Sequence, residues 1–77
     1  MNKEWKAVTS RTWRTKDGLG FVEDIGTRHE PQYRMSYRHS AMHGFVTIKG
    51  RDDLPAAALD LHSAMTRVEQ AIKKASG

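Results

Sequence analysis

Cysteine is absent from this 77-residue chain, which excludes disulfides, thiolate zinc sites, iron–sulfur clusters and a cysteine nucleophile. The absence fits a reducing compartment, so we expect a cytoplasmic protein. No run of about 18 apolar residues occurs, and the N-terminal sequence lacks the apolar segment of a signal peptide. We therefore expect no association with a membrane.

The chain is too short for several domains or for a separate substrate domain. With 38% hydrophobic and 29% charged residues, it resembles folded globular proteins more than disordered ones. We expect residues 1–77 to form a single domain, as a monomer or a small homo-oligomer. The initiator methionine and the short KKASG ending indicate a complete small gene product.

The net charge of +4 is concentrated in the first two-thirds of the chain. Residues 1–51 contain ten Lys and Arg against five acidic residues, whereas residues 52–77 contain three against four. An uneven distribution of this kind favours contact between the basic part and an anionic partner.

Hydrophobic residues recur at helical spacing in the last third of the chain. Asp52 and Asp53 are candidate N-caps, and Pro55 fits only a first turn. The pattern predicts one helix over about 53–75, with Leu59 on its solvated side. The expected buried stripe comprises Leu54, Ala58, Leu61, Met65, Val68 and Ile72.

Upstream of this helix the hydrophobic period changes to two, which is typical of β-strands. Residues 19–26, 32–39 and 44–50 read as strands, and residues 5–15 as a weaker fourth one. The Lys-Asp-Gly turn at 16–18 joins that fourth strand to its successor as a hairpin. We predict an α+β fold, in which a three- or four-stranded antiparallel meander over about residues 5–50 packs on one long C-terminal helix.

The segment 32–39 indicates which side chains of the sheet face solvent. Tyr33, Met35 and Tyr37 alternate with arginines and suit the side that packs on the helix. Arginines between them then project from the opposite face, where they bind phosphates by charge. The candidate nucleic-acid contacts are Arg34, Arg38 and Lys49, with Arg11, Arg14 and Arg28 around them.

A solvated polar face is the ordinary alternative for a two-layer domain of this size. Glu23 and Asp24 also interrupt the basic surface, because neighbours on a strand place one acid on each face. Phe45, if it points outward, adds an aromatic ring on which bases stack.

Aromatic and leucine side chains offer a second mode of binding. Trp5, Trp13, Phe45 and Leu59 are candidate contacts with a protein partner, because tryptophan is enriched at such interfaces. The two tryptophans suit the edge of the core equally well. If the two tryptophans are exposed, they favour a protein partner over nucleic acid.

Histidines and hydroxyls give little sign of chemistry. His39 and His43 have the spacing of helical zinc ligands, with His29 and His62 as further candidates, but the segment between the first two lies between two expected strands. Ser36 and Ser40 lack the G-x-S-x-G elbow of a catalytic serine. We expect no metal, no other cofactor and no enzymatic activity.

The sequence RTKDGLGFVEDIG, the following EPQYRMSY and the predicted helix resemble the arm-type DNA-binding domains of tyrosine recombinases and transposon integrases. The resemblance implies a three-stranded sheet plus helix whose sheet enters the DNA major groove, with Arg34 and Arg38 as contacts. The chain departs from that pattern at Glu23 and Asp24, where a strand that faces DNA would be basic.

In its small, cysteine-free α+β build the chain is also similar to phage-encoded inhibitors such as anti-CRISPR proteins. We expect a non-catalytic binding module whose basic outer sheet face engages nucleic acid. The alternative is a small phage or mobile-element protein that binds and inhibits a host protein or nucleoprotein complex.

Overall fold

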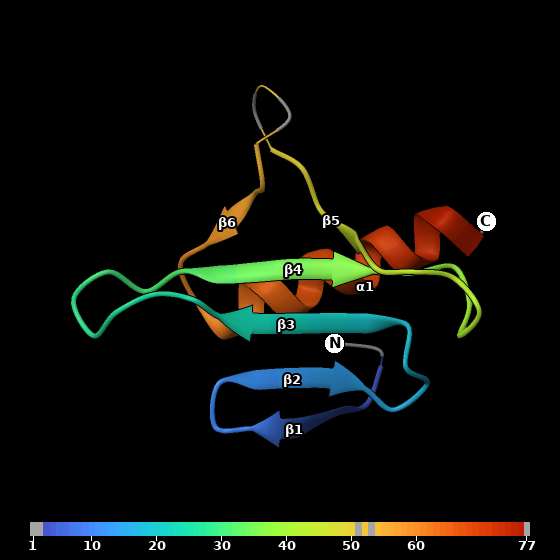
Figure 1. The fold of residues 1–77 in the computed structure, drawn as a ribbon, viewed down its shortest axis with the longest axis horizontal. Helices are drawn as coiled ribbons and strands as arrows, with labels where there is room; N and C mark the ends of the chain where they lie inside the picture. Colours follow the sequence, from blue (N-terminus) through green and yellow to red (C-terminus); the bar gives the residue numbers. More distant parts are fainter. Residues whose placement is uncertain (1–2, 51, 53, 77) are drawn as a thin grey trace.

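A meandering sheet and one C-terminal helix make up the fold in a computed structural model, which describes residues 3–50, 52 and 54–76 (Figure 1). The main strands follow each other in sequence order, and all pairings are antiparallel, which confirms the predicted α+β fold. The elements are β1 (Trp5–Thr9), β2 (Thr12–Thr15), β3 (Gly20–Asp24), β4 (Tyr33–Tyr37), β5 (Val46–Thr47), β6 (Ala57–Ala58) and α1 (Leu61–Ser76).

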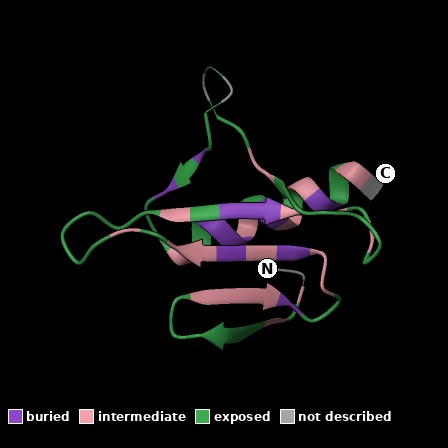
Figure 2. Ribbon diagram, viewed as in Figure 1, coloured by how far each residue is buried: buried purple, intermediate pink, exposed green. Residues whose placement is uncertain are grey.

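The helix crosses behind β3 and β4 in Figure 1 and contacts both strands and β6. Buried residues gather where these elements meet (Figure 2). Met35 and Val22 from the sheet and Val68 from the helix are fully buried. Tyr33 and Tyr37 pack against this core from the same side of β4 as Met35, as the alternation predicts.

Gly20 lies where the helix comes closest to the sheet. A Cβ at this position would be 2.7 Å from Cγ1 of Val68 and 3.0 Å from Cδ1 of Ile72. Both distances are shorter than an ordinary van der Waals contact, so only glycine at position 20 lets α1 pack this close to the sheet. The contact assigns Gly20 and its neighbour at i+2, Val22, to the side that faces the helix.

The predicted single strand over residues 5–15 is two strands. β1 and β2 pair as a tight hairpin, in which the hydroxyls of Thr9 and Thr12 lie 2.7 Å apart. The Thr9 hydroxyl also accepts a hydrogen bond from the N–H of Arg11, a turn that threonine forms without glycine or asparagine. The Lys-Asp-Gly turn then joins β2 to β3, as predicted.

The helix begins at Leu61, and not near residue 53 as the hydrophobic spacing predicts. Asp60 is the N-cap, because its carboxylate accepts hydrogen bonds from the N–H of Ser63 (2.8 Å) and from its hydroxyl (2.9 Å). These bonds hold the pKa of Asp60 below its usual value. Of the predicted caps, Asp52 precedes the helix by many residues and Asp53 lies outside the described residues.

Residues 55–58 are extended because they pair with the sheet. Pro55 forms a bridge with Lys49, and the N–H of Ala56 donates to the carbonyl of Ile48. β6 then pairs with the first half of β4, while the short β5 pairs with its second half. Pairing with the sheet thus overrides the helical propensity of three consecutive alanines.

Met35→Ala tests the assignment of the buried side of β4. We expect a loss of about 2–5 kcal/mol in the free energy of unfolding, because the substitution opens a cavity beneath the helix. Urea denaturation measures it. Met42→Ala is the matched control, since Met42 is 96% exposed and its loss should leave stability unchanged. Equal effects of the two substitutions would contradict the assignment.

Candidate functional site

The side of the sheet that faces away from α1, called the outer face below, carries a continuous row of side chains across five strands. Pairing places Lys6 beside Arg14, Arg14 beside Phe21, Phe21 beside Ser36 and Ser36 beside Thr47. These residues alternate with those that face the helix, so they share the outer face. Cations therefore stand at one end of the row and hydroxyls at the other, with an aromatic ring between them.

Phe21, Phe45 and Arg38 form a stack on this face, called the phenylalanine–arginine cluster below. The two rings are 5.9 Å apart between centroids and tilted by 51°. The guanidinium carbon of Arg38 is 4.5 Å from the centroid of the Phe45 ring, within the range of a cation–π interaction. Ser36 also belongs to the outer face, but it is only 8% exposed. Phe45 is 42% exposed.

Arg38 is held in place by backbone carbonyls. Its Nε donates to the carbonyl of Gly18 (2.8 Å), and one terminal nitrogen donates to Ala41 (3.4 Å). A guanidinium has five N–H donors, so these two bonds leave others for a ligand. Gly18 has a φ of +78°, a conformation that glycine adopts without strain, and this turns its carbonyl toward Arg38.

The turn that presents Gly18 is organised by Asp17. Its carboxylate accepts hydrogen bonds from the Thr15 hydroxyl (2.6 Å), the N–H of Leu19 (3.0 Å) and the ammonium of Lys3 (2.6 Å). Partial burial raises the pKa of Asp17, but these bonds outweigh it and lower the pKa from 3.8 to about 2. The loop that positions Arg38 is therefore stabilised by an ionised carboxylate.

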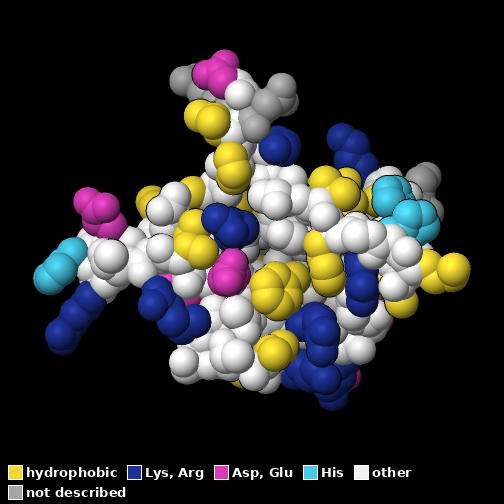
Figure 3. Space-filling model, in the orientation of Figure 1, with side chains coloured by type: hydrophobic (Ala, Val, Ile, Leu, Met, Phe, Trp, Pro, Cys, Tyr) yellow, Lys and Arg dark blue, Asp and Glu magenta, His cyan; other side chains and the backbone are white. Residues whose placement is uncertain are grey.

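The acidic side chains of the outer face are paired with cations. Glu23 lies 3.7 Å from a terminal nitrogen of Arg34, and Glu4 lies 3.2 Å from Lys16. Within residues 3–50, 52 and 54–76, Lys6 and Arg14 form no ion pair. Figure 3 looks onto this face and shows hydrophobic side chains near the centre of the sheet, surrounded by Lys and Arg, with an acidic side chain beside them.

Arg34 and Arg38, the two arginines predicted on this side, therefore differ in how far their charge is available to a ligand. Arg34 points outward as predicted, but its partner Glu23 offsets its charge. Arg38 also points outward, and its charge is free of any carboxylate in the described part of the chain. Glu23 and Asp24 lie on opposite faces, as alternation requires, and Asp24 pairs with Arg11.

No protein-family model, curated protein or solved structure gives a significant match to this chain. Its function is therefore inferred from the arrangement of its own side chains.

The remaining predicted cations lie away from the row. Arg11, in the β1–β2 turn, donates to the carbonyl of Gly26 (2.6 Å) and lies 3.5 Å from Asp24, so it ties that turn to the β3–β4 loop. Arg28 is exposed in the β3–β4 loop, and Lys49 is exposed beyond β5. Only Arg14 of the peripheral candidates lies on the same row as the aromatic cluster.

The tryptophans lie on the helix side of the sheet. Trp5 donates through Nε1 to a carboxylate oxygen of Glu69 on α1 (2.7 Å). The Trp13 ring lies 6.2 Å from the Tyr33 ring, and both pack against the core. The two indoles therefore take part in packing within the fold. The other two candidates for a protein contact, Phe45 and Leu59, are exposed and lie apart from the tryptophans.

The histidines form ring contacts in the loop between β4 and β5. His39 lies 5.8 Å from His43, whose Nδ1 is 2.7 Å from the hydroxyl of Ser40. Among the residues that the structure describes, no three His, Asp or Glu side chains gather as a metal site would require. The one helix of the described chain is too short and too polar to span a bilayer.

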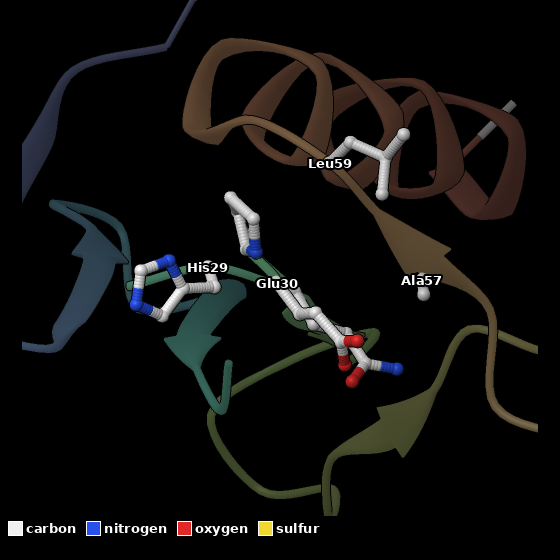
Figure 4. A pocket seen from close by; sticks show the side chains of 6 residues that line it. His29, Glu30, Ala57 and Leu59 are labelled. Atoms are coloured by element: carbon white, nitrogen blue, oxygen red, sulfur yellow. The ribbon is translucent and has the colours of Figure 1, made fainter. Parts of the chain in front are cut away.

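An open pocket of about 410 Å³ lies between the β3–β4 loop and β6 (Figure 4). His29 and Glu30 border it on the loop side, and Ala57 and Leu59 border it on the other side. Leu59 precedes the helix and is 76% exposed.

Phe21 is the member of the cluster that the sequence pattern does not predict. The adjacent apolar pair Phe21–Val22 leaves open which residue faces inward. Gly20 resolves the question, since a glycine within a strand marks the close approach of another element, and alternation then places Phe21 outside.

Asp17→Asn tests the ionised turn. Because the pKa of Asp17 is lower in the folded chain than its ordinary 3.8, the wild type should be more stable than the variant above about pH 4. The difference in Tm should shrink as the pH falls from about 4 to about 2, where the carboxylate becomes protonated. Glu30→Gln, in an exposed loop, is the control. A difference independent of pH would contradict a role for the charge.

Proposed function

We propose that the protein binds nucleic acid through the outer face of its sheet. The observation that carries the proposal is the row that begins with Lys6 and Arg14 and continues into Phe21. Neither cation has an acidic partner in the described chain, so both retain their charge for an anionic ligand. The aromatic ring beside them supplies an apolar contact that phosphate binding alone does not need.

The proposed contacts are a revision of those expected from sequence. Lys6 is added to the proposed contacts. Arg14, expected at the periphery, becomes a central contact, and Arg38 contributes as a member of the phenylalanine–arginine cluster. Arg34 contributes less, since Glu23 compensates its charge. Arg28 and Lys49 supply additional exposed charge from the neighbouring loops, and Arg11 mainly connects two turns.

A protein partner is the second candidate, and the exposed Leu59 beside an open pocket favours it. Such a partner fits the alternative of a small phage or mobile-element inhibitor. The tryptophans do not contribute to it, because Trp5 and Trp13 are packed within the fold. The two candidates differ in their response to salt, since an apolar contact at Leu59 releases no counterions.

The double substitution Lys6→Ala with Arg14→Ala tests the nucleic-acid proposal. We expect weaker binding to DNA and a smaller dependence on salt, because each lost phosphate contact removes about 0.9 from the log–log slope on duplex and about 0.7 on single strands. Fluorescence anisotropy of a labelled oligonucleotide at several salt concentrations measures both.

Lys73→Ala with Lys74→Ala is the matched control, because it removes the same charge from the exposed end of the helix. Binding that falls equally in both variants would indicate a general charge effect and overturn the assignment to the outer face. Absence of binding by the wild type at low salt would overturn the proposal itself.

A further inference from the structure

We infer that the ligand of the outer face is single-stranded nucleic acid, whose unpaired bases stack on the phenylalanine–arginine cluster. This inference rests on the proposed function and names its substrate class. Its basis is the position of Phe21, Phe45 and Arg38, which bring three planar groups together on a face that carries unpaired cations.

Part of the cluster's aromatic surface is accessible to solvent. Phe45 is 42% exposed, a large fraction for a phenylalanine whose ring already contacts another ring and a guanidinium. In a duplex the flat faces of the bases are stacked on each other, and the grooves present base edges and phosphates, with the thymine methyl as their apolar group. A phenylalanine pressed against phosphates would lose water without gaining an apolar contact.

In a single strand the flat faces of the bases are free. Aromatic rings and arginine planes both accept a stacked base, and such contacts tolerate any sequence because every base has such a face. Arg38 is held against Phe45 by two backbone carbonyls before any ligand arrives. The stack is therefore preorganised, which lowers the entropy lost on binding.

The cations lie at a suitable distance from the stack. Arg14 lies on β2, directly beside Phe21, and Lys6 lies on β1, one strand further from it; adjacent strands are roughly 4.8 Å apart. A single-stranded nucleic acid that crosses the sheet along this row can therefore place one base on the cluster. The phosphates next to that base then lie near Lys6 and Arg14. The hydroxyls of Ser36 and Thr47 end the row on the other side.

The test compares a short labelled oligo-dT with a duplex of the same length by fluorescence anisotropy. The wild type should bind the single strand at least about tenfold more tightly. Phe45→Leu keeps the apolar volume but removes the ring, and should weaken binding of oligo-dT by about fivefold to a hundredfold. Phe45→Tyr keeps the ring and should bind oligo-dT as tightly as the wild type does.

The variants also separate this inference from the proposed function. Equal binding of duplex and single strand, with no effect of Phe45→Leu, would overturn stacking and leave phosphate binding in place. No binding of either probe at low salt would overturn both. Urea denaturation of each variant verifies the fold, and oligo-rU in place of oligo-dT decides whether RNA or DNA is the better ligand.

Leu59→Ala is the control for loss of an exposed apolar side chain elsewhere. Leu59 lies beside the pocket at β6, away from the cluster, and its loss should leave the affinity for oligo-dT unchanged. A loss equal to that of Phe45→Leu would show that exposed apolar groups contribute without stacking, and would overturn the inference.

Discussion

The rest of the structure depends on the close approach of α1 to the sheet at Gly20. The side chains of Val68 and Ile72 occupy the space in which a Cβ of residue 20 would lie, so the helix rests directly on the backbone of β3. This contact determines which side of β3 and of its neighbour β4 is buried, because side chains alternate and antiparallel pairing transmits the alternation to the next strand. It thereby also determines which residues form the outer face.

Sequence predicts the parts of the fold in which periodicity and burial agree. Met35 and its two tyrosine neighbours are recognisable because they alternate with arginines, and Val68 because it belongs to a regular helical stripe. Prediction is wrong where contacts distant in sequence decide. Residues 55–58 carry helix-forming alanines but pair with β4 and with the segment at Ile48 and Lys49. The β1–β2 turn uses threonine hydroxyls in place of the usual glycine or asparagine.

The sequence predicts some residues of the candidate site, but which of them lie side by side depends on cross-strand pairing. Arg38 and Phe45 are found from sequence, but their stacking depends on a loop whose path no local pattern specifies. The pairing of Arg34 with Glu23 depends on the register of β3 against β4, which the sequence leaves open. The register of β2 against β3 brings Phe21 beside Arg14. The centre of the candidate site is therefore a mixed aromatic and basic row, and not the pair Arg34 and Arg38.

The divided edge at β4 has a consequence for behaviour at high concentration. Two strands of two residues each share this edge, because β5 pairs with the second half of β4 and β6 pairs with its first half. At the opposite edge, β1 has a shift of register between Ala7 and Thr9. Long, regular edges are the templates on which sheets of different molecules join into aggregates. Because both edges here are short or irregular, the fold limits such growth even though much of its sheet is uncovered on one side.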